Sequence, residues 1–341
     1  MRTTVTLREV AAEAGVSIST VSRVLDERLP ASRSANAGRV REAATRLGYR
    51  RDVAAASLRR RTSGTIGILV PRLSDHVMAL MFEALYEEAA RRGQFALVSI
   101  NKDDPTGGRR AVEALLDRRV DGLVLAATRL SDDLPEQLRS RGVPHVLALR
   151  TDGTSPSSVC DDELGGYLAT RHLLDLGHRV IAALPGPAYT STANGRLAGY
   201  RHAMTEAGIE VPDAWVRRSG FSADEGERVG LELLDAVPEA TAIFAANDDL
   251  ALGVLDAAAS RGLAVPDDLS VVGYNDTPLA ARLPVPLTSV RVPFDAVAAG
   301  AMDLLDEFRG HLHDHSPVDP VMRRVATPSL IPRESSVPLR H

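Results

Sequence analysis

Short apolar segments alternate with amphipathic segments over most of this chain, and this alternation limits the folds available to it. Seven runs rich in Val, Ile and Leu predict strands at 65–70, 96–100, 122–126, 145–149, 180–184, 242–246 and 270–274. Stretches with helical spacing lie between them, at 79–92, 109–118, 164–176, 196–207, 225–236 and 250–261. Strands that alternate with helices form parallel sheets covered by helices on both faces. About 280 residues of this pattern fit two sheets better than one.

The charge of the chain is divided between a basic N-terminal segment and an acidic remainder. Residues 1–61 contain thirteen arginines and six acidic residues, a net charge of +7. Since the whole chain carries −5, residues 62–341 carry −12. A basic segment on an acidic body is typical of a nucleic-acid-binding module, although a solvated, Arg-rich helical cap has the same charge. The pattern within the segment has to decide between the two.

That pattern predicts two short helices joined by a tight turn. Apolar residues at 7, 10, 11 and 14 have helical spacing, and Gly15 can supply the left-handed conformation that ends the helix. Ser17 can cap a second helix over 18–24. Small Ala11, where the helices must cross, completes the pattern of a helix-turn-helix, whose second helix enters the major groove. A helical hairpin without a DNA-binding role is the alternative.

The exposed face of the predicted second helix suits DNA. Ile18 and Ser19 lie at its N-terminal end, where side chains reach base edges. Arg23 can pair with a guanine or bind a phosphate. Short hydroxyl side chains suited to phosphates complete the face: Ser17, Thr20 and Ser22.

The run from Thr6 to Asp26, TLREVAAEAGVSISTVSRVLD, resembles the start of LacI/GalR-family transcriptional regulators. Similarity continues through Leu47-Gly-Tyr49, Ile66-Gly-Ile-Leu-Val-Pro71, Ala245-Ala-Asn-Asp248, Val271-Val-Gly-Tyr274 and Thr288-Ser-Val-Arg291. The resemblance implies an N-terminal all-α helix-turn-helix head and an α/β body of two doubly wound parallel-sheet subdomains, like that of periplasmic binding proteins. It also adds four DNA-binding candidates, Thr6, Asp26, Ala55 and Leu58.

The resemblance sets the expected domain boundaries. The helix-turn-helix domain is expected at 1–51, a hinge helix and linker at 52–63, and an effector-binding and dimerisation domain at 64–341. Within the last, the N-subdomain is expected at 64–161 and 291–323, and the C-subdomain at 162–290 and 324–341. Three crossings between the subdomains are expected near 160–162, 289–292 and 322–325.

The linker is expected to act as a switch. Residues 52–58 are Ala-rich but have no apolar stripe long enough to fold alone. In the family, such a stretch forms a hinge helix on operator DNA, and a leucine wedges into a central base step of the minor groove. Leu58 aligns with that leucine. The alternative is that Leu58 is only an apolar linker residue.

The cleft between the subdomains is the expected effector site, because ligands of parallel sheets bind beyond the carboxyl ends of the strands. Asp, Asn and Arg side chains beside an aromatic ring suit a polyhydroxylated ligand, whose hydroxyls they bind and whose apolar face the ring covers. The effector-binding candidates are Asp75, Met78, Asp103, Arg150, Ser191, Arg196, Phe221, Asn247 and Asn275.

Some positions depart from the family pattern. The usual Ser-Asn-Pro-Phe-Phe after the first strand is Ser74-Asp-His-Val-Met78, which replaces an aromatic with a thioether. The frequent Gly-Phe-Asp-Asp is Gly273-Tyr-Asn-Asp276, which replaces an acid with the Asn275 amide. In the head, the usual Thr-Arg pair is Asn36-Ala37, and Pro-Asn is Arg51-Asp52. The departures among the pocket residues count against a standard hexose as the ligand, but they do not exclude another sugar or a glycoside.

The resemblance implies a ligand-responsive regulator, a homodimer on a pseudo-palindromic operator that a sugar-like inducer releases. A corepressor that tightens operator binding is the alternative within the family. A solute-binding transport protein is an alternative of another class, but it would need a signal peptide and no DNA-reading head. The sequence has no Gly-x-Gly-x-x-Gly after a strand, no P-loop and no Gly-x-Ser-x-Gly, so we predict neither an enzyme nor a cofactor.

The cysteine and histidine residues of the sequence limit the metal sites and disulfides that it can form. Cys160 is the single cysteine, which excludes an internal disulfide and a Cys-rich zinc site. The cluster His311-x-His313-Asp314-His315 lies in a polar, Pro-flanked stretch, and we predict a solvated loop there and no metal.

The sequence shows no secretory h-region and no run of eighteen apolar residues, so we expect a cytoplasmic protein without a membrane partner.

Overall fold

The computed structural model describes residues 5–25, 32, 34–49, 62–313 and 322–339. The chain divides into two compact units, Met1–Gly64 and Thr65–His341, which we call the head and the body. The described part of the head consists of α1 (Leu7–Ala14), α2 (Ile18–Val24) and α3 (Ala35–Leu47). Val10, Val21 and Val40, one from each helix, are fully buried in its core. The predicted all-α head is confirmed, with α1 and α2 at the predicted positions.

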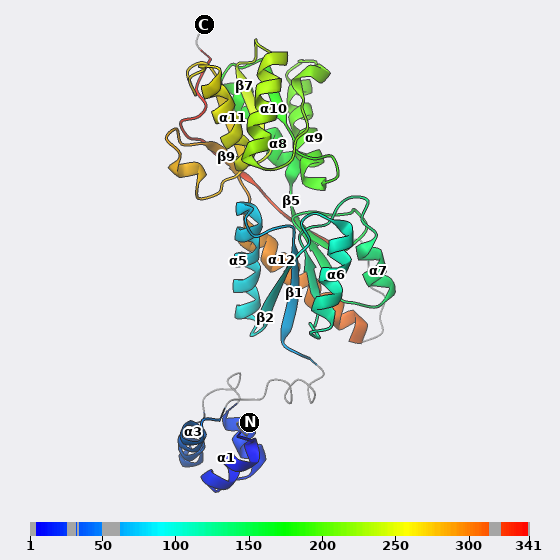
Figure 1. Cartoon of the computed structure of the whole chain (residues 1–341), viewed down its shortest axis with the longest axis vertical. Coiled ribbons are helices and arrows are strands. Elements are labelled where there is room, and N and C mark those ends of the chain that lie inside the picture. The colour runs from blue at the N-terminus through cyan, green and yellow to red at the C-terminus, as the bar shows by residue number, and fades with distance from the viewer. Residues whose placement is uncertain (1–4, 26–31, 33, 50–61, 314–321, 340–341) are drawn as a thin grey trace. The chain divides into compact units, whose positions relative to one another are not determined.

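The first half of the body is built on sheet A, whose strand order is β10-β5-β4-β3-β1-β2. Its strands are β1 (Thr65–Val70), β2 (Phe95–Ile100), β3 (Leu123–Leu125), β4 (His145–Ala148), β5 (Ser157–Cys160) and β10 (Arg323–Ala326), and all pairings are parallel. Its helices are α5 (His76–Arg91), α6 (Pro105–Leu116), α7 (Leu134–Ser140) and α12 (Phe294–His313). Side chains of α5 and α12 pack on one face of the sheet, and those of α6 and α7 on the other. Figure 1 shows this three-layer arrangement, which we call the N-subdomain.

The second half, the C-subdomain, is built on sheet B in the order β11-β9-β8-β7-β6. Its strands are β6 (Ile181–Leu184), β7 (Ala242–Ala245), β8 (Ser270–Asn275), β9 (Thr288–Arg291) and β11 (Ser329–Ile331). Its helices are α8 (Asp162–Asp175), α9 (Ser191–Glu206), α10 (Ala223–Ala236) and α11 (Asp248–Ser260), with 3-10 turns η1 (Asp213–Trp215) and η2 (Ala280–Arg282). Side chains of α8 and α9 cover one face, and those of α10 and α11 the other. The prediction of two doubly wound sheets is confirmed, with one exception: β11 pairs antiparallel with β9.

The chain crosses between the subdomains three times. It leaves sheet A after β5, returns to the N-subdomain from β9 into α12, and leaves again between β10 and β11. The first and third crossings lie side by side, because the Asp161 backbone N–H donates to the Ala326 carbonyl over 3.0 Å. The third crossing was expected near 322–325, with the N-subdomain ending at 323. Its true position follows Ala326, because Arg323–Ala326 pairs in register with Ser157–Cys160 as the edge strand of sheet A.

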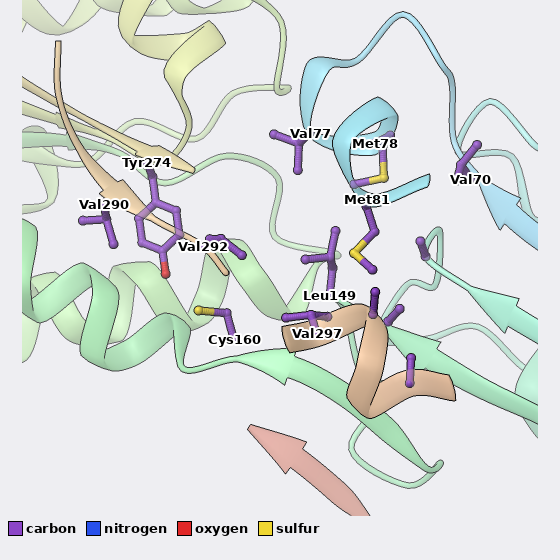
Figure 2. Close-up of a cluster of buried hydrophobic side chains, with 14 of the residues drawn as sticks. Val70, Val77, Met78, Met81, Leu149, Cys160, Tyr274, Val290, Val292 and Val297 are labelled. Atoms are coloured by element: carbon purple, nitrogen blue, oxygen red, sulfur yellow. The ribbon is translucent and has the colours of Figure 1, made fainter. Parts of the chain in front are cut away.

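An apolar cluster runs through the crossing region. In Figure 2, Val77, Met78, Met81 and Leu149 gather on the N-subdomain side of this cluster, while the Tyr274 hydroxyl and the Cys160 thiol point toward one another. All six are buried, and the cluster continues into both subdomains. Burial raises the pKa of the Cys160 thiol to about 12, so the thiol stays protonated and acts as a packing group.

Candidate functional sites

Local caps fix the two helices α1 and α2 and the turn between them. The Thr6 side chain accepts from the Glu9 N–H and the Glu9 carboxylate accepts from the Thr6 N–H, which makes a capping box at the start of α1. Gly15 ends α1 with φ of +63°, a conformation that costs glycine little. Ser17 then caps α2 by accepting from the Thr20 N–H. These local bonds set the angle at which α2 leaves the turn.

The exposed face of α2 carries part of the predicted DNA-binding set. Ile18, Ser19 and Arg23 are exposed, and Ser22 is half-buried. Thr6, Ser17 and Thr20 instead take part in the caps. Asp26, Ala55 and Leu58 lie outside the described residues. The exposed face therefore combines one apolar side chain, hydroxyls and a guanidinium.

The start of α3 differs from the family pattern in a way that the structure explains in part. Ser34 caps this helix by accepting from the Ala37 N–H. Ala37 is fully buried, so this position contributes to the packing of the head, whereas Asn36 is exposed and accepts from Arg39. Asn36 and Arg39 are thus the polar side chains that this helix end presents to solvent.

The body contains a pocket, partly open to solvent, that is lined by side chains of both subdomains. Its walls come from the start of α5, the loop after β4, α9, the segment before α10, and the ends of β7 and β8. The lining residues are Asp75, Val77, Met78, Leu149, Arg150, Thr192, Arg196, Phe221, Asn247 and Asn275. Seven of the nine predicted effector-binding residues line it. Val77, Leu149 and Thr192 were missed, because small and apolar side chains carry no signal that separates a pocket wall from a core.

The other two predicted residues support the lining from behind. The Asp103 carboxylate forms an ion pair with Arg150, Nη1 to Oδ1 at 3.0 Å, and the Arg150 side chain is 3% exposed. The Ser191 hydroxyl oxygen accepts from the Thr151 N–H over 2.9 Å, a contact between the C-subdomain and the N-subdomain. Asp103 and Ser191 therefore position the wall.

The loops around the pocket hold strained backbone. Positive φ angles occur at Lys102, Asp103, Leu149, Asn275 and Asp276, each at or just after the carboxyl end of a strand. Such conformations cost non-glycine residues about 1–3 kcal/mol each and gather at functional sites. Asn275, at φ of +98°, lines the pocket with a buried side-chain oxygen that has no hydrogen-bond partner. This oxygen therefore keeps its full capacity to accept hydrogen bonds.

Two buried arginines supply donors, and both are held by carboxylates. Arg196 lies in the second turn of α9, not at the helix start as expected, because Thr190 caps the helix. Its Nε donates to Asp162 over 2.8 Å, its Nη1 to the Ala246 carbonyl over 2.5 Å, and its guanidinium stacks 3.8 Å from the centre of the Tyr274 ring. The Arg150 guanidinium lies 5.7 Å from the centre of the Phe221 ring. Each guanidinium is thus fixed before any ligand arrives.

Two other lining residues are helix caps. Asn247 accepts from the Leu250 N–H at the start of α11 and donates to the Phe221 carbonyl over 3.0 Å, so it positions Phe221. Asp75 caps α5 by accepting from the Val77 and Met78 N–H groups through one oxygen. Burial raises the pKa of the Asp75 carboxyl. Neither of these two N–H groups uses the second carboxylate oxygen of Asp75.

Three further contacts join the subdomains, in addition to the hydrogen bond between Thr151 and Ser191. His76 Nδ1 lies 3.0 Å from Asp249 Oδ1, the Leu130 N–H donates to the Tyr189 carbonyl over 3.0 Å, and the Arg129 guanidinium lies 4.1 Å from the centre of the Tyr189 ring. Because of these contacts, the two subdomains meet beside the pocket as well as at the crossings.

Asp248 holds the strained loop that carries Asn275. Its carboxylate accepts from the Thr277 N–H and from the Ser289 hydroxyl, both over 2.6 Å. Burial raises the pKa of this carboxyl to about 6, although both hydrogen bonds favour its charged form.

We expect Asp248→Asn to flatten the pH dependence of body stability between about pH 4 and pH 6. The raised pKa means that the folded state holds this proton more tightly than the unfolded state. The contribution of Asp248 is therefore present below about pH 4 and is lost as the pH rises through 6, a change of about 3 kcal/mol. Urea unfolding at several pH values measures it. The exposed Asp224→Asn is the matched control, and an unchanged profile in Asp248→Asn would contradict the assignment.

The described residues contain no group of His, Cys, Asp and Glu that could hold a metal ion. The loop predicted for the histidine cluster is wrong for His311 and His313, which belong to the end of α12, while Asp314 and His315 lie outside the described residues. None of the described helices is long and apolar enough to cross a membrane.

Comparison with known proteins gives matches over both units. Residues 6–52 match the family model "Bacterial regulatory proteins, lacI family", and residues 170–336 match "Periplasmic binding protein-like domain". Catabolite control protein A of Priestia megaterium is 32% identical over 308 residues, which cover 89% of this chain and 92% of that protein. The lac repressor dimer bound to operator and the anti-inducer ONPF is 30% identical, with a TM-score of 0.83 over 98% of this chain and 100% of that chain. A complex of the transcriptional regulator CelR with cellobiose has 30% identity and a TM-score of 0.74, over 97% of this chain and 99% of that chain.

Proposed function

Since this chain belongs to the lacI family of bacterial regulatory proteins, a family of DNA-binding transcriptional regulators, we propose that it is a repressor that a sugar-like inducer releases from its operator. The observation that carries this proposal is the pocket between the two subdomains, walled by side chains of both, in a chain that also presents an exposed helix-turn-helix face. No catalytic role is proposed for the pocket residues. Binding to DNA places the action of the protein in the cytoplasm.

The chemistry of the pocket favours a small polyhydroxylated ligand. Asn275 and Asp75 offer acceptors, and the two guanidinium groups offer donors. Because Arg150 and Arg196 are each neutralised by a carboxylate, they do not call for an anion. Phe221, Met78 and Leu149 supply apolar surface for the face of a sugar ring. The cellobiose bound to CelR and the anti-inducer bound to the lac repressor are ligands of structurally similar proteins.

The position of the pocket between the subdomains also couples ligand binding to DNA binding. A ligand that binds only one relative angle of the subdomains shifts the body toward that angle by its differential affinity. The cross-pocket contacts made by His76, Arg129 and Ser191 are the ones that such a rotation would break. We propose that the rotation separates the hinge segments of a dimer and so lowers operator affinity. The alternative is the opposite response, in which a corepressor raises operator affinity. The experiment below distinguishes the two.

The dimer is proposed to form along the β2 edge of sheet A. Phe95 is 57% exposed and Ile100 44% exposed at the two ends of this edge strand, and Tyr86 of α5 is 48% exposed. The Tyr86 ring packs against Phe82 of the same helix, and side chains of this helix pack on sheet A. A second copy is the proposed occupant, because the lac repressor, which is similar over the whole chain, is a dimer on its operator.

We expect Phe95→Asp to produce a monomer and to weaken operator binding by at least about 100-fold. A charge buried within an apolar interface is costly, and a monomer loses the linked binding of two half-sites. Light scattering and gel-shift titration at one salt concentration measure the two effects. Val325→Asp is the matched control, since Val325 is 55% exposed on β10, the opposite edge of the same sheet. A dimeric Phe95→Asp would contradict the proposed interface.

The proposed function is tested in two steps with the full chain. Selection from a random duplex pool identifies the operator, which we expect to be pseudo-palindromic. A thermal-shift screen of sugars, glycosides and nucleobases then identifies the effector, since a ligand at 100 times its Kd adds about 2.7 kcal/mol to stability. An effector that lowers operator affinity supports the proposal, and one that raises it supports the corepressor alternative. A chain that enriches no duplex contradicts the function.

A further inference from the structure

One exposed isoleucine stands on the DNA-reading face of the head. Ile18 is the first residue of α2, and 42% of its surface is exposed. Among the described residues of the head, it is the only large apolar side chain that is exposed. The next apolar side chain along this helix, Val21, is fully buried and belongs to the apolar core of the head. Ile18 does not belong to the apolar cluster that forms the core of the head, so core packing does not account for an isoleucine at this position.

The polar groups around Ile18 are already engaged with one another. Ser17 Oγ lies 2.8 Å from Ser19 Oγ and 2.8 Å from Thr20 Oγ1, and it accepts from the Thr20 N–H over 3.2 Å. This hydroxyl network holds the start of α2 and leaves Ile18 as its protruding side chain. The next exposed polar group on the same face, Arg23, lies one turn beyond Ser19.

The chemistry of the major groove gives Ile18 one suitable partner. The N-terminal residues of the second helix of a helix-turn-helix contact base edges. An isoleucine side chain neither donates nor accepts a hydrogen bond, and the C5-methyl group of thymine is the apolar group that the major groove displays. Cytosine carries only a hydrogen at C5, and next to it presents the N4 donor in place of the thymine O4 acceptor, which Ile18 would leave without a partner.

We propose that Ile18 selects thymine at one position of each operator half-site through contact with the C5-methyl group. The inference rests on the proposed DNA-reading role of α2 and adds the base and the atom group that this residue recognises. It predicts that the operator contains a T·A pair at that position, with the thymine methyl facing the start of α2.

Replacing thymidine by deoxyuridine tests the contact directly. Deoxyuridine pairs like thymidine and keeps the O4 acceptor, but it lacks the methyl group. The selected operator is rebuilt with one T replaced at a time, symmetrically in both half-sites, and affinity for the full chain is measured at one salt concentration. We expect one position at which affinity falls about 4-fold per half-site, or about 16-fold for both, the effect of one lost apolar methyl contact.

Variants of Ile18 assign that methyl effect to this residue. Ile18→Ala should bind the thymidine and deoxyuridine operators equally, whereas Ile18→Val, which keeps a branched apolar end, should still distinguish them. Thr45→Ala, a neutral change at an exposed residue of α3 outside the predicted DNA-binding set, should leave the methyl effect at its wild-type size. Affinity for random DNA, which depends on phosphate charge, should be the same for all of these chains and shows that each is folded.

The outcomes separate this inference from the proposed function. A chain that binds a selected operator but shows no sensitive thymine overturns the role of Ile18 while the proposed function stands. The same holds if Ile18→Ala keeps the full sensitivity to the methyl group. A chain that selects no duplex contradicts both proposals together.

Discussion

Arg196→Met should lower the stability of the body by about 3–5 kcal/mol and abolish the response to effector. Arg196 is 5% exposed and donates to the Asp162 carboxylate and to the Ala246 carbonyl. Methionine fills similar volume but leaves a carboxyl buried without its partner, and burial raises the pKa of that carboxyl even beside Arg196. The midpoint of urea unfolding measures the stability. The ligand-induced thermal shift, with the compound that the screen yields, measures binding.

A second substitution separates the two effects. In Arg196→Met with Asp162→Asn the buried charge is gone, so most of the lost stability should return. Effector binding should not return, because the donor that lines the pocket is still missing. If the double variant bound effector normally, Arg196 would be a residue of the fold and not of the site.

Gly199→Ala should destabilise the body by about 4 kcal/mol or more. Helices α8 and α9 approach so closely at Gly199 that an added Cβ would lie 1.9 Å from the Glu163 carbonyl oxygen and 2.5 Å from the Tyr167 nitrogen. Both atoms belong to the backbone, so the helices would have to move apart and open the core beneath them. Thermal unfolding followed by circular dichroism measures the loss.

Gly310→Ala is the matched control for this substitution. Gly310 also lies within a helix, α12, but an added Cβ there meets no atom within 4 Å. Alanine favours a helix over glycine by up to about 1 kcal/mol, so this variant should be slightly more stable than the parent chain. Equal losses in both variants would show that close approach of α8 and α9 is not the cause.

The head could be predicted from the sequence because its structure is decided locally. Gly15 and Ser17 occupy the turn and cap positions that the pattern assigns to them, and the apolar spacing marks the buried face. The strands buried on both faces, such as β1 and β7, were predicted for a similar reason, since continuous apolar runs mark them.

The sequence did not predict the short strands β5, β9, β10 and β11, and β10 shows one reason, because it depends on a distant partner. β10 begins with Arg323 and Arg324, and its residues are mostly exposed, so it carries no apolar pattern. It becomes a strand by pairing with β5, more than 160 residues earlier in the chain. The displaced third crossing has the same cause, because the boundary of the N-subdomain is set by this pairing.

The features of the pocket also divide into those that the sequence could predict and those that it could not. Polar residue types after predicted strands were sufficient to suggest Arg150 and Asn275 as lining residues. The positive φ of Leu149 and the use of Asn247 as a cap for α11 depend on backbone angles and hydrogen bonds that residue types do not reveal. Asp103 likewise faces Arg150 because its loop is strained, not because of any spacing in the sequence.

The late return of the chain to sheet A has a consequence for protein synthesis. The C-subdomain can fold largely from the contiguous residues 162–291, but the N-subdomain needs α12 and β10 to cover β4, β5 and α5. At typical elongation rates, about 10–30 s separate the emergence of Cys160 from that of Ala326. Throughout this interval the nascent N-subdomain exposes an unpaired β5 edge and the apolar surface that α12 later buries. We therefore expect chaperones on the ribosome to engage this subdomain, and ribosome profiling of chaperone-bound nascent chains should show occupancy that ends once β10 has emerged.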